Sequence, residues 1–142
     1  MKRLKWLAAM SALVMLCLGF YACGDPDDDD GSGGNSGLVG SWERKYSTYQ
    51  TETLTFGRDG RYESIDFCEG YYYKDKWYTS TKYTYKGSYS YNDATKTLVI
   101  NITSQNGSTN NPYTKTYIVH TLNATTLILI NSYGDSQYFN RK

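Results

Sequence analysis

The sequence predicts an all-β domain over residues 38–142, with eight strands in an up-and-down antiparallel barrel. Short alternating or apolar runs separated by turn residues fill this segment, and no stretch of 3.6-residue period is long enough for a main helix. Fifteen of the 16 tyrosines lie here, and aromatic residues favour strands. Eight strands over this length give about 13 residues per strand and connection, which is typical of meandering sheets and barrels. A β-sandwich is the alternative.

The strands are expected in order at 38–49, 50–56, 61–67, 78–91, 97–104, 113–122, 126–133 and 136–142. Between them stand turn residues, at 57–60, 92–95, 106–112, 123–124 and 134–135. Only the boundary between residues 49 and 50 lacks a turn signal. An up-and-down order would pair each strand with its sequence neighbour and remove exposed sheet edges.

Residues 1–22 have the pattern of a secretory signal peptide. Basic residues come first, an apolar run covers residues 6–20, and the small Ala22 precedes Cys23. Fifteen helical residues would span roughly 22 Å, less than the roughly 30 Å of a bilayer core. A cleaved signal is therefore expected rather than a membrane span.

The three residues Ala22-Cys23-Gly24 resemble the lipobox of bacterial lipoproteins. The resemblance implies that diacylglycerol is attached to the Cys23 thiol and that Cys23 becomes the first residue of the mature chain. Each buried methylene contributes roughly 0.8 kcal/mol, so two or more acyl chains anchor a protein firmly. The expected partner of this end of the chain is therefore a membrane, reached through the lipid.

Residues 23–37 read as a tether, with five aspartates, no basic residue, and otherwise mostly Gly, Ser and Asn. The acidic run resembles the export signal of Bacteroidetes lipoproteins, which implies an outer-membrane protein facing the cell surface. A plain spacer on a periplasm-facing lipoprotein is the alternative. Counted from Asp25, the EF-hand positions 6 and 12 fall on Asp30 and Ser36, so no calcium loop is expected.

A family resemblance rests on short motifs spread over residues 38–142. They are Leu38-Val39-Gly40-Ser41-Trp42, Leu54-Thr55-Phe56 with the turn at 57–60 and Tyr62, Leu98-Val99-Ile100, and Leu127-Ile128-Leu129 before Tyr138. Together they resemble the lipocalin-like domain of many Bacteroidetes lipoproteins. The resemblance implies a barrel whose end is plugged by Gly40 and Trp42, with Arg141 packed across the indole as a stabilising cation.

Tyrosines recur at period two in the fourth expected strand, at Tyr83, Tyr85, Tyr89 and Tyr91, with Gly87 between them. The glycine suggests a bulge or bend. The rings either fill the barrel core or line a cup for a small hydrophobic or glycan ligand.

The connection at 68–77 holds three consecutive tyrosines and a tryptophan. Candidate ligand-binding residues there are Tyr71, Tyr72 and Trp77, because rigid amphipathic rings suit recognition surfaces. We expect a contact loop at the barrel rim. A lid or a strand extension folded back on the barrel is the alternative.

Nothing in the sequence favours catalysis, a cofactor or a metal. The mature domain keeps one thiol, Cys68, and one histidine, His120, with no third group to orient a nucleophile. The carboxylates that could serve glycosidic cleavage, at Glu63, Asp66, Glu69 and Asp75, read as solvent-facing. Residues 38–142 carry 12 basic and 9 acidic side chains, and no basic stripe suits nucleic acid.

Two functions follow from these features. The first is an outer-membrane surface lipoprotein with a lipocalin-like module that binds a small apolar or glycan ligand. The second is a non-catalytic structural or accessory lipoprotein that contacts other envelope proteins through its tyrosine-rich loop.

Overall fold

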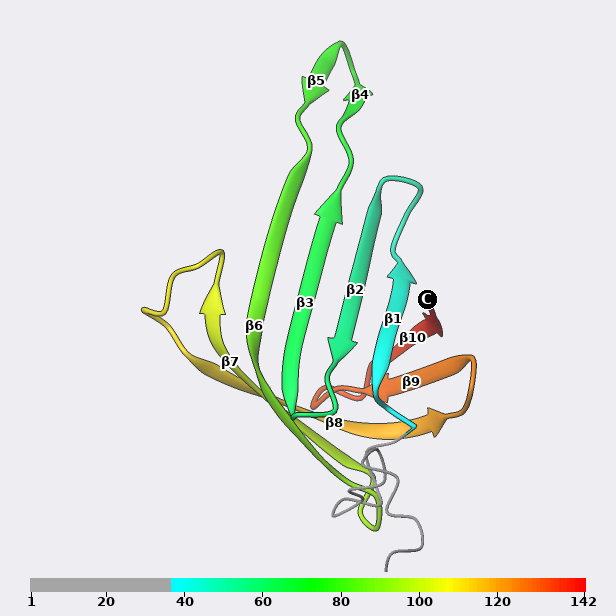
Figure 1. Ribbon diagram of the computed structural model, residues 1–142. Coiled ribbons are helices and arrows are strands. Elements are labelled where there is room, and N and C mark those ends of the chain that lie inside the picture. The colour runs from blue at the N-terminus through cyan, green and yellow to red at the C-terminus, as the bar shows by residue number, and fades with distance from the viewer. Residues whose placement is uncertain (1–36) are drawn as a thin grey trace, which may run out of the picture. The chain divides into compact units, whose positions relative to one another are not determined.

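The computed structural model describes residues 37–142, which form a closed barrel of eight antiparallel strands and a separate two-stranded hairpin (Figure 1). The predicted signal, the lipidation site Cys23 and the tether up to residue 36 lie outside the described residues. No helix in the described part is long and apolar enough to cross a membrane. The strands are β1 (Gly40–Lys45), β2 (Gln50–Phe56), β3 (Arg61–Cys68), β4 (Tyr71–Tyr73), β5 (Lys76–Tyr78), β6 (Thr81–Asn92), β7 (Thr97–Gln105), β8 (Tyr113–Leu122), β9 (Thr126–Ile130) and β10 (Ser136–Arg141).

The barrel confirms the predicted up-and-down order. Its strands follow one another as β1-β10-β9-β8-β7-β6-β3-β2, so each pairs with its neighbour along the chain once the inserted hairpin is set aside. The ring closes between β1 and β10, where Trp42 lies opposite Arg141 and Glu43 opposite Asn140. Closure leaves one sheet curled on itself instead of two stacked sheets, which excludes the sandwich.

The first strand is shorter than predicted. Residues 46–49 form a turn in which the amides of Tyr46 and Ser47 donate to the carbonyl of Gln50, at 2.9 and 3.4 Å. The Tyr49 amide donates to the Ser47 hydroxyl at 3.2 Å. A serine hydroxyl that bonds its local backbone stabilises such a turn without Gly, Pro or Asn, so the sequence carried only a weak signal for it.

The segment 68–77, expected as a loop, contains the hairpin β4–β5 instead. Lys74 and Asp75 at its tip have φ angles of 47° and 60°. Positive φ at both central residues is typical of the type I′ turn, whose twist matches that of antiparallel strands. Figure 1 shows the hairpin standing beyond the ends of β3 and β6. The segment is therefore a strand extension, and β6 starts at Thr81 rather than at residue 78.

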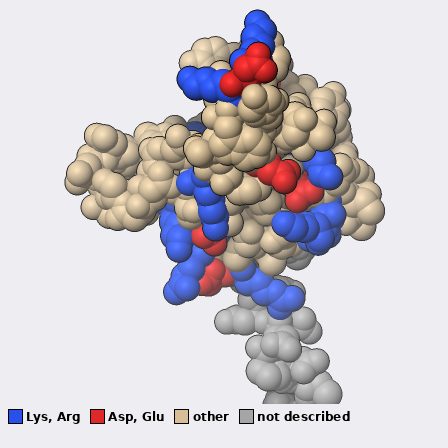
Figure 2. Space-filling model, turned by 90° about the horizontal axis from the view of Figure 1, so that it is seen from above, with Lys and Arg blue, Asp and Glu red and all other residues tan. Residues whose placement is uncertain are grey.

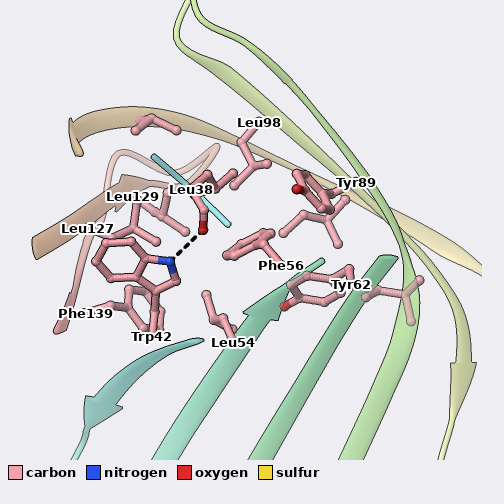
Figure 3. Packing of buried hydrophobic residues seen from close by; sticks show 13 residues of the cluster. Leu38, Trp42, Leu54, Phe56, Tyr62, Tyr89, Leu98, Leu127, Leu129 and Phe139 are labelled. Atoms are coloured by element: carbon pink, nitrogen blue, oxygen red, sulfur yellow. Dashed lines mark hydrogen bonds between the residues drawn. The ribbon is translucent and has the colours of Figure 1, made fainter. Parts of the chain in front are cut away.

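The core fills the half of the barrel where the chain enters at Leu38, called here the closed half (Figure 3). The Trp42 indole donates to the Leu38 carbonyl at 2.9 Å, which ties the entering chain to the core. The Phe56 ring lies edge-on to Tyr89, with centroids 4.9 Å apart. The buried hydrophobic residues are Leu38, Trp42, Leu54, Phe56, Tyr62, Tyr89, Leu98, Ile100, Ile102, Val119, Leu127, Leu129 and Phe139.

The closed end is shut by Gly40, Trp42 and Arg141 together. The Arg141 guanidinium carbon lies 4.1 Å from the Trp42 ring centroid, a cation–π geometry. The guanidinium nitrogens of Arg141 donate to the backbone carbonyls of Gly37, Val39 and Ala124 at 2.7, 2.8 and 3.0 Å. Gly40 has φ +127°, and a Cβ there would run into the Arg141 guanidinium. The glycine therefore leaves the space that the arginine occupies.

The bulge that the interrupted tyrosine row predicts lies at Gly87, between β6 and β7, with the extra residue, Thr103, in β7. The register with β7 shifts between Lys86 and Gly87. A Cβ at Gly87 would lie 2.8 Å from the Asn101 carbonyl carbon and 3.1 Å from the Ile102 Cα. The two backbones approach so closely here that only glycine fits.

Candidate functional site

The side chains on the inner face of the barrel change from apolar to polar and aromatic halfway along the strands. The open half is the end that carries the connections after β1, β3, β7 and β9. Period-two alternation places Arg44 beyond Trp42, Glu52 before Leu54 and Asp66 beyond the buried Ser64 on this inner face. We call the polar and aromatic lining of the open half the mouth: Arg44, Glu52, Asp66, Tyr83, Tyr85, Tyr113, Lys115 and Tyr117.

The tyrosine row of β6 is divided between the two halves. Tyr83 is 43% exposed and, with the half-buried Tyr85, belongs to the open half. Tyr89 is a core residue whose hydroxyl donates to the Gly57 carbonyl at 2.8 Å. Tyr91 lies toward the other end of the strand, and its hydroxyl donates to Asp93 at 3.1 Å. The four rings therefore do not line one surface, and only Tyr83 and Tyr85 reach the mouth.

An ion pair between neighbouring strands stands at the floor of the mouth. Arg44 Nη2 lies 2.8 Å from Glu52 Oε2, and both side chains are mostly buried, at 17% and 15% exposure. Tyr46 donates its hydroxyl to the same Glu52 oxygen at 2.7 Å and also accepts from Arg44. The guanidinium carbon lies 4.0 Å from the Tyr46 ring centroid and 5.0 Å from that of Phe139. Both charges are thus held in fixed positions above the core.

The tyrosines around this pair stay protonated well above neutral pH. Burial, followed by the Glu52 charge, raises the pKa of the Tyr117 hydroxyl to about 12. Burial and the hydrogen bond to Glu52 raise the pKa of Tyr46 well above its usual range. Burial and the Asp66 charge also raise the pKa of Tyr85. These hydroxyls are therefore donors as well as acceptors at any physiological pH.

Asp66, expected to face solvent, is partly buried on the inner face of the barrel. It directly opposes Glu52 across the β2–β3 ladder, and its Oδ1 accepts a hydrogen bond from the side-chain amide of Gln50 at 3.3 Å. On the opposite wall, the Lys115 ammonium lies 5.7 Å from the Tyr85 centroid and 5.8 Å from that of Tyr113. Two carboxylates, two cations and several phenols therefore share the mouth.

One face of the hairpin carries a stack of three rings. Tyr71 lies between Tyr49 and Tyr78, with centroid distances of 5.3 and 5.0 Å and interplanar angles of 22° and 10°. Tyr49 belongs to the turn between β1 and β2, so the stack fixes the hairpin against the rim of the barrel. The structure thus gives Tyr71 a role in holding the hairpin.

The other face of the hairpin presents Tyr72 and Trp77, which oppose each other across the β4–β5 ladder. They are 65% and 59% exposed. Gly70 makes room for the indole, because a Cβ there would come within 3.0 Å of the Trp77 ring. Both rings are accessible, as a contact surface requires, and the Trp77 indole also lies close to Gly70.

Other surface features offer less chemistry. A hollow of about 470 Å³ lies on the outer side of β2, β3 and β6. Its charged groups already pair, Arg61 with Asp59 at 3.0 Å and Lys86 with Glu63 at 3.7 Å. Figure 2 shows basic and acidic side chains interspersed among broad uncharged areas. Within residues 37–142 no group of three or more His, Cys, Asp or Glu could hold a metal ion.

The sole thiol and the sole histidine of this segment lie apart. Cys68 ends β3 at the open rim, whereas the exposed His120 lies toward the closed end of β8, with Nδ1 3.1 Å from the Thr121 hydroxyl. The arrangement gives no support to a nucleophile pair.

The site residues that sequence reasoning missed are Arg44, Tyr46, Glu52, Tyr113, Lys115 and Tyr117. The signal was present, since Arg44 is two residues from Trp42 and Glu52 is two residues from Leu54. Continuing the apolar period by two positions in each strand would have placed both on the inner face.

No family model, curated protein or solved structure matches the chain. The closed eight-stranded antiparallel barrel follows from the strand pairing alone. The lipocalin-like resemblance continues to rest on the sequence motifs.

Proposed function

We propose that this protein is a lipocalin-like surface lipoprotein that binds a small ligand at the mouth of its barrel. The observation that carries the proposal is the change of lining between the two halves. A barrel that served only as a stable scaffold would gain most from apolar packing throughout, because buried charges cost free energy. Here Arg44 and Glu52 are held in place instead, next to tyrosine rings that suit ligand binding.

The proposed lipid anchor would be joined to the closed half of the barrel. The described chain enters the barrel at Leu38, in the closed half, and the mouth and hairpin lie at the other end. A lipid on Cys23 would thus tether the domain by its closed end. We expect Cys23→Ala to move the protein from the membrane to the soluble fraction, and continued membrane retention would refute the anchor.

The surface location has its own test. Replacing Asp27, Asp28, Asp29 and Asp30 by Asn should lower the fraction of the protein that added protease digests on whole cells. Unchanged digestion would contradict an export role for the acidic run and favour the plain spacer.

The ligand proposal is tested with the secreted Cys23→Ala protein by native mass spectrometry. A bound small molecule should appear as a mass adduct, and Tyr117→Ala, which removes a ring from the mouth, should reduce it. Tyr138→Ala is the matched control, because this ring is 62% exposed and lies on the outer face of β10. An adduct lost equally in both variants, or absent from the parent protein, would contradict binding at the mouth.

A second function is favoured by the hairpin. Tyr72 and Trp77 form an exposed pair of rings beyond the barrel rim, which suits a contact with another envelope protein. This role is also non-catalytic. The double change Tyr72→Ser and Trp77→Ser should abolish crosslinking to that partner while the melting temperature stays within a few degrees, and a large loss of stability would assign these rings to the fold instead.

A further inference from the structure

We propose that the ligand of the mouth is an uncharged, hydroxyl-rich sugar ring and not an acyl chain. This inference rests on the proposed function and decides between the two ligand classes that the sequence left open. It follows from which atoms of the mouth have partners, from how the two carboxylates are spaced, and from the balance of charge.

In each carboxylate of the mouth, only one of the two oxygens accepts hydrogen bonds from the described residues. The hydrogen bonds that Glu52 accepts within residues 37–142 both reach Oε2, from Arg44 and Tyr46. The bond that Asp66 accepts from Gln50 reaches Oδ1. Glu52 Oε1 and Asp66 Oδ2 accept none of the hydrogen bonds found within residues 37–142, so both keep lone pairs to offer to a ligand. A carboxylate oxygen needs a donor when water leaves, and sugar hydroxyls are donors.

The spacing of the carboxylates suits adjacent hydroxyls of one ring. Glu52 and Asp66 are directly opposite in the antiparallel β2–β3 ladder. Side chains at such positions have Cβ atoms about 5 Å apart and point to the same face. Two acceptors held side by side can each take one hydroxyl of a vicinal pair, and the Arg44 and Gln50 contacts fix both in place.

Ring faces complete the lining for a sugar. Tyr85 stands on β6, and Tyr113 and Tyr117 stand on β8, with the Lys115 ammonium beside the rings of Tyr85 and Tyr113. A pyranose stacks its C–H face on such rings, while the ammonium and the protonated phenols donate to its oxygens.

An acyl chain fits the same lining poorly. Closing hydrocarbon over Glu52 and Asp66 would strip water from two charges and return no hydrogen bond, which is a large cost. The apolar surface that such a chain would need lies in the closed half, where thirteen side chains already pack together. The two carboxylates balance Arg44 and Lys115, so the mouth carries no excess charge to attract an ionic ligand.

The test is isothermal titration of the secreted Cys23→Ala protein with malto-, cello-, xylo- and chito-oligosaccharides and, separately, with palmitate. Asp66→Asn removes one carboxylate and leaves an amide that can still pair with Gln50. Glu52→Gln is the second variant. Glu63→Gln is the matched control, because Glu63 lies on the outer face of the same strand as Asp66. Melting curves confirm that each variant is folded.

At least one oligosaccharide should bind. Asp66→Asn and Glu52→Gln should each weaken its affinity by about tenfold or more, whereas Glu63→Gln should change the affinity less than about twofold. Palmitate should not bind. Palmitate binding without sugar binding would overturn the inference and leave the ligand-binding barrel standing. Binding of no probe would overturn both. Sugar binding that Asp66→Asn and Glu52→Gln leave unchanged would place the sugar elsewhere and overturn the inference alone.

Discussion

Replacing Gly87 by alanine should destabilise the barrel strongly, because β6 and β7 approach each other there without room for a side chain. The added methyl group would sit 2.8 Å from the Asn101 carbonyl carbon and 3.1 Å from the Ile102 Cα, and closer still to the Asn101 oxygen. All three atoms belong to the backbone of β7. No change of rotamer can relieve the contact, so the strand itself must shift.

The size of the effect follows from what that shift disturbs. Ile100 and Ile102, on either side of Asn101, are each 1% exposed and belong to the core. Overpacking a tight site costs about 1–3 kcal/mol, and a backbone clash belongs at the upper end. We therefore expect a loss of about 3 kcal/mol in the free energy of unfolding. For a domain of this size such a loss lowers the melting temperature by roughly 10–20 °C.

The assay is urea unfolding followed by circular dichroism, with a thermal melt as a second measure. Gly107→Ala is the control, since Gly107 has φ +83° but nothing within 4 Å of an added Cβ. It should show only the cost of left-handed backbone, about 1–2 kcal/mol. If Gly87→Ala melts within a few degrees of the parent protein, the strands are not as close as described and the reasoning fails.

Three further changes test the packing and the titration. Arg141→Ala should lower the stability measured by thermal melt by about 2 kcal/mol, because the hydrogen bonds to backbone carbonyls and the stacking on the indole are lost. Arg141→Lys should recover less than half of this stability, because lysine lacks the planar guanidinium. Full recovery would mean that the charge alone matters. Tyr89→Phe should cost about 1 kcal/mol in urea unfolding through the lost bond to Gly57, and no change would mean that water replaces it. Stability should fall as the pH rises above about 10, because tyrosines of the unfolded chain ionise there. In the folded state Tyr117, whose pKa is raised to about 12, and Tyr62, whose pKa is raised further, stay protonated. Tyr117→Phe should make this decline less steep in urea midpoints measured across pH, and an unchanged slope would contradict the cause.

Much of the fold was readable because a β-strand repeats every two residues. Leu54 and Phe56, or Leu98 and Ile100, mark one face of a strand wherever the chain folds. The turn at 57–60 and the sequence Asn106-Gly107 mark reversals with the same certainty, because few residues adopt the backbone angles required. Eight such strands with short connections leave few arrangements other than a meander.

The misses share one physical cause. The turn at 46–49 depends on a serine hydroxyl whose bond exists only once the turn has formed. The hairpin at 71–78 depends on Lys74 and Asp75 accepting positive φ, with Tyr71 stacked between rings from two segments to stabilise it. In both places, contacts between residues decided what the residue types alone left open.

The sequence by itself determined the eight barrel strands, most of their turns and the irregularity at Gly87, because these follow from local alternation and from the steric needs of single residues. Only the tertiary structure decided which polar side chains face inward at the mouth. Arg44, Glu52 and Asp66 look like surface residues one at a time, and their pairing depends on the register of three strands. Register is a long-range property, because it is fixed when the barrel closes around one core. The register of these strands brings the residues of the candidate site together.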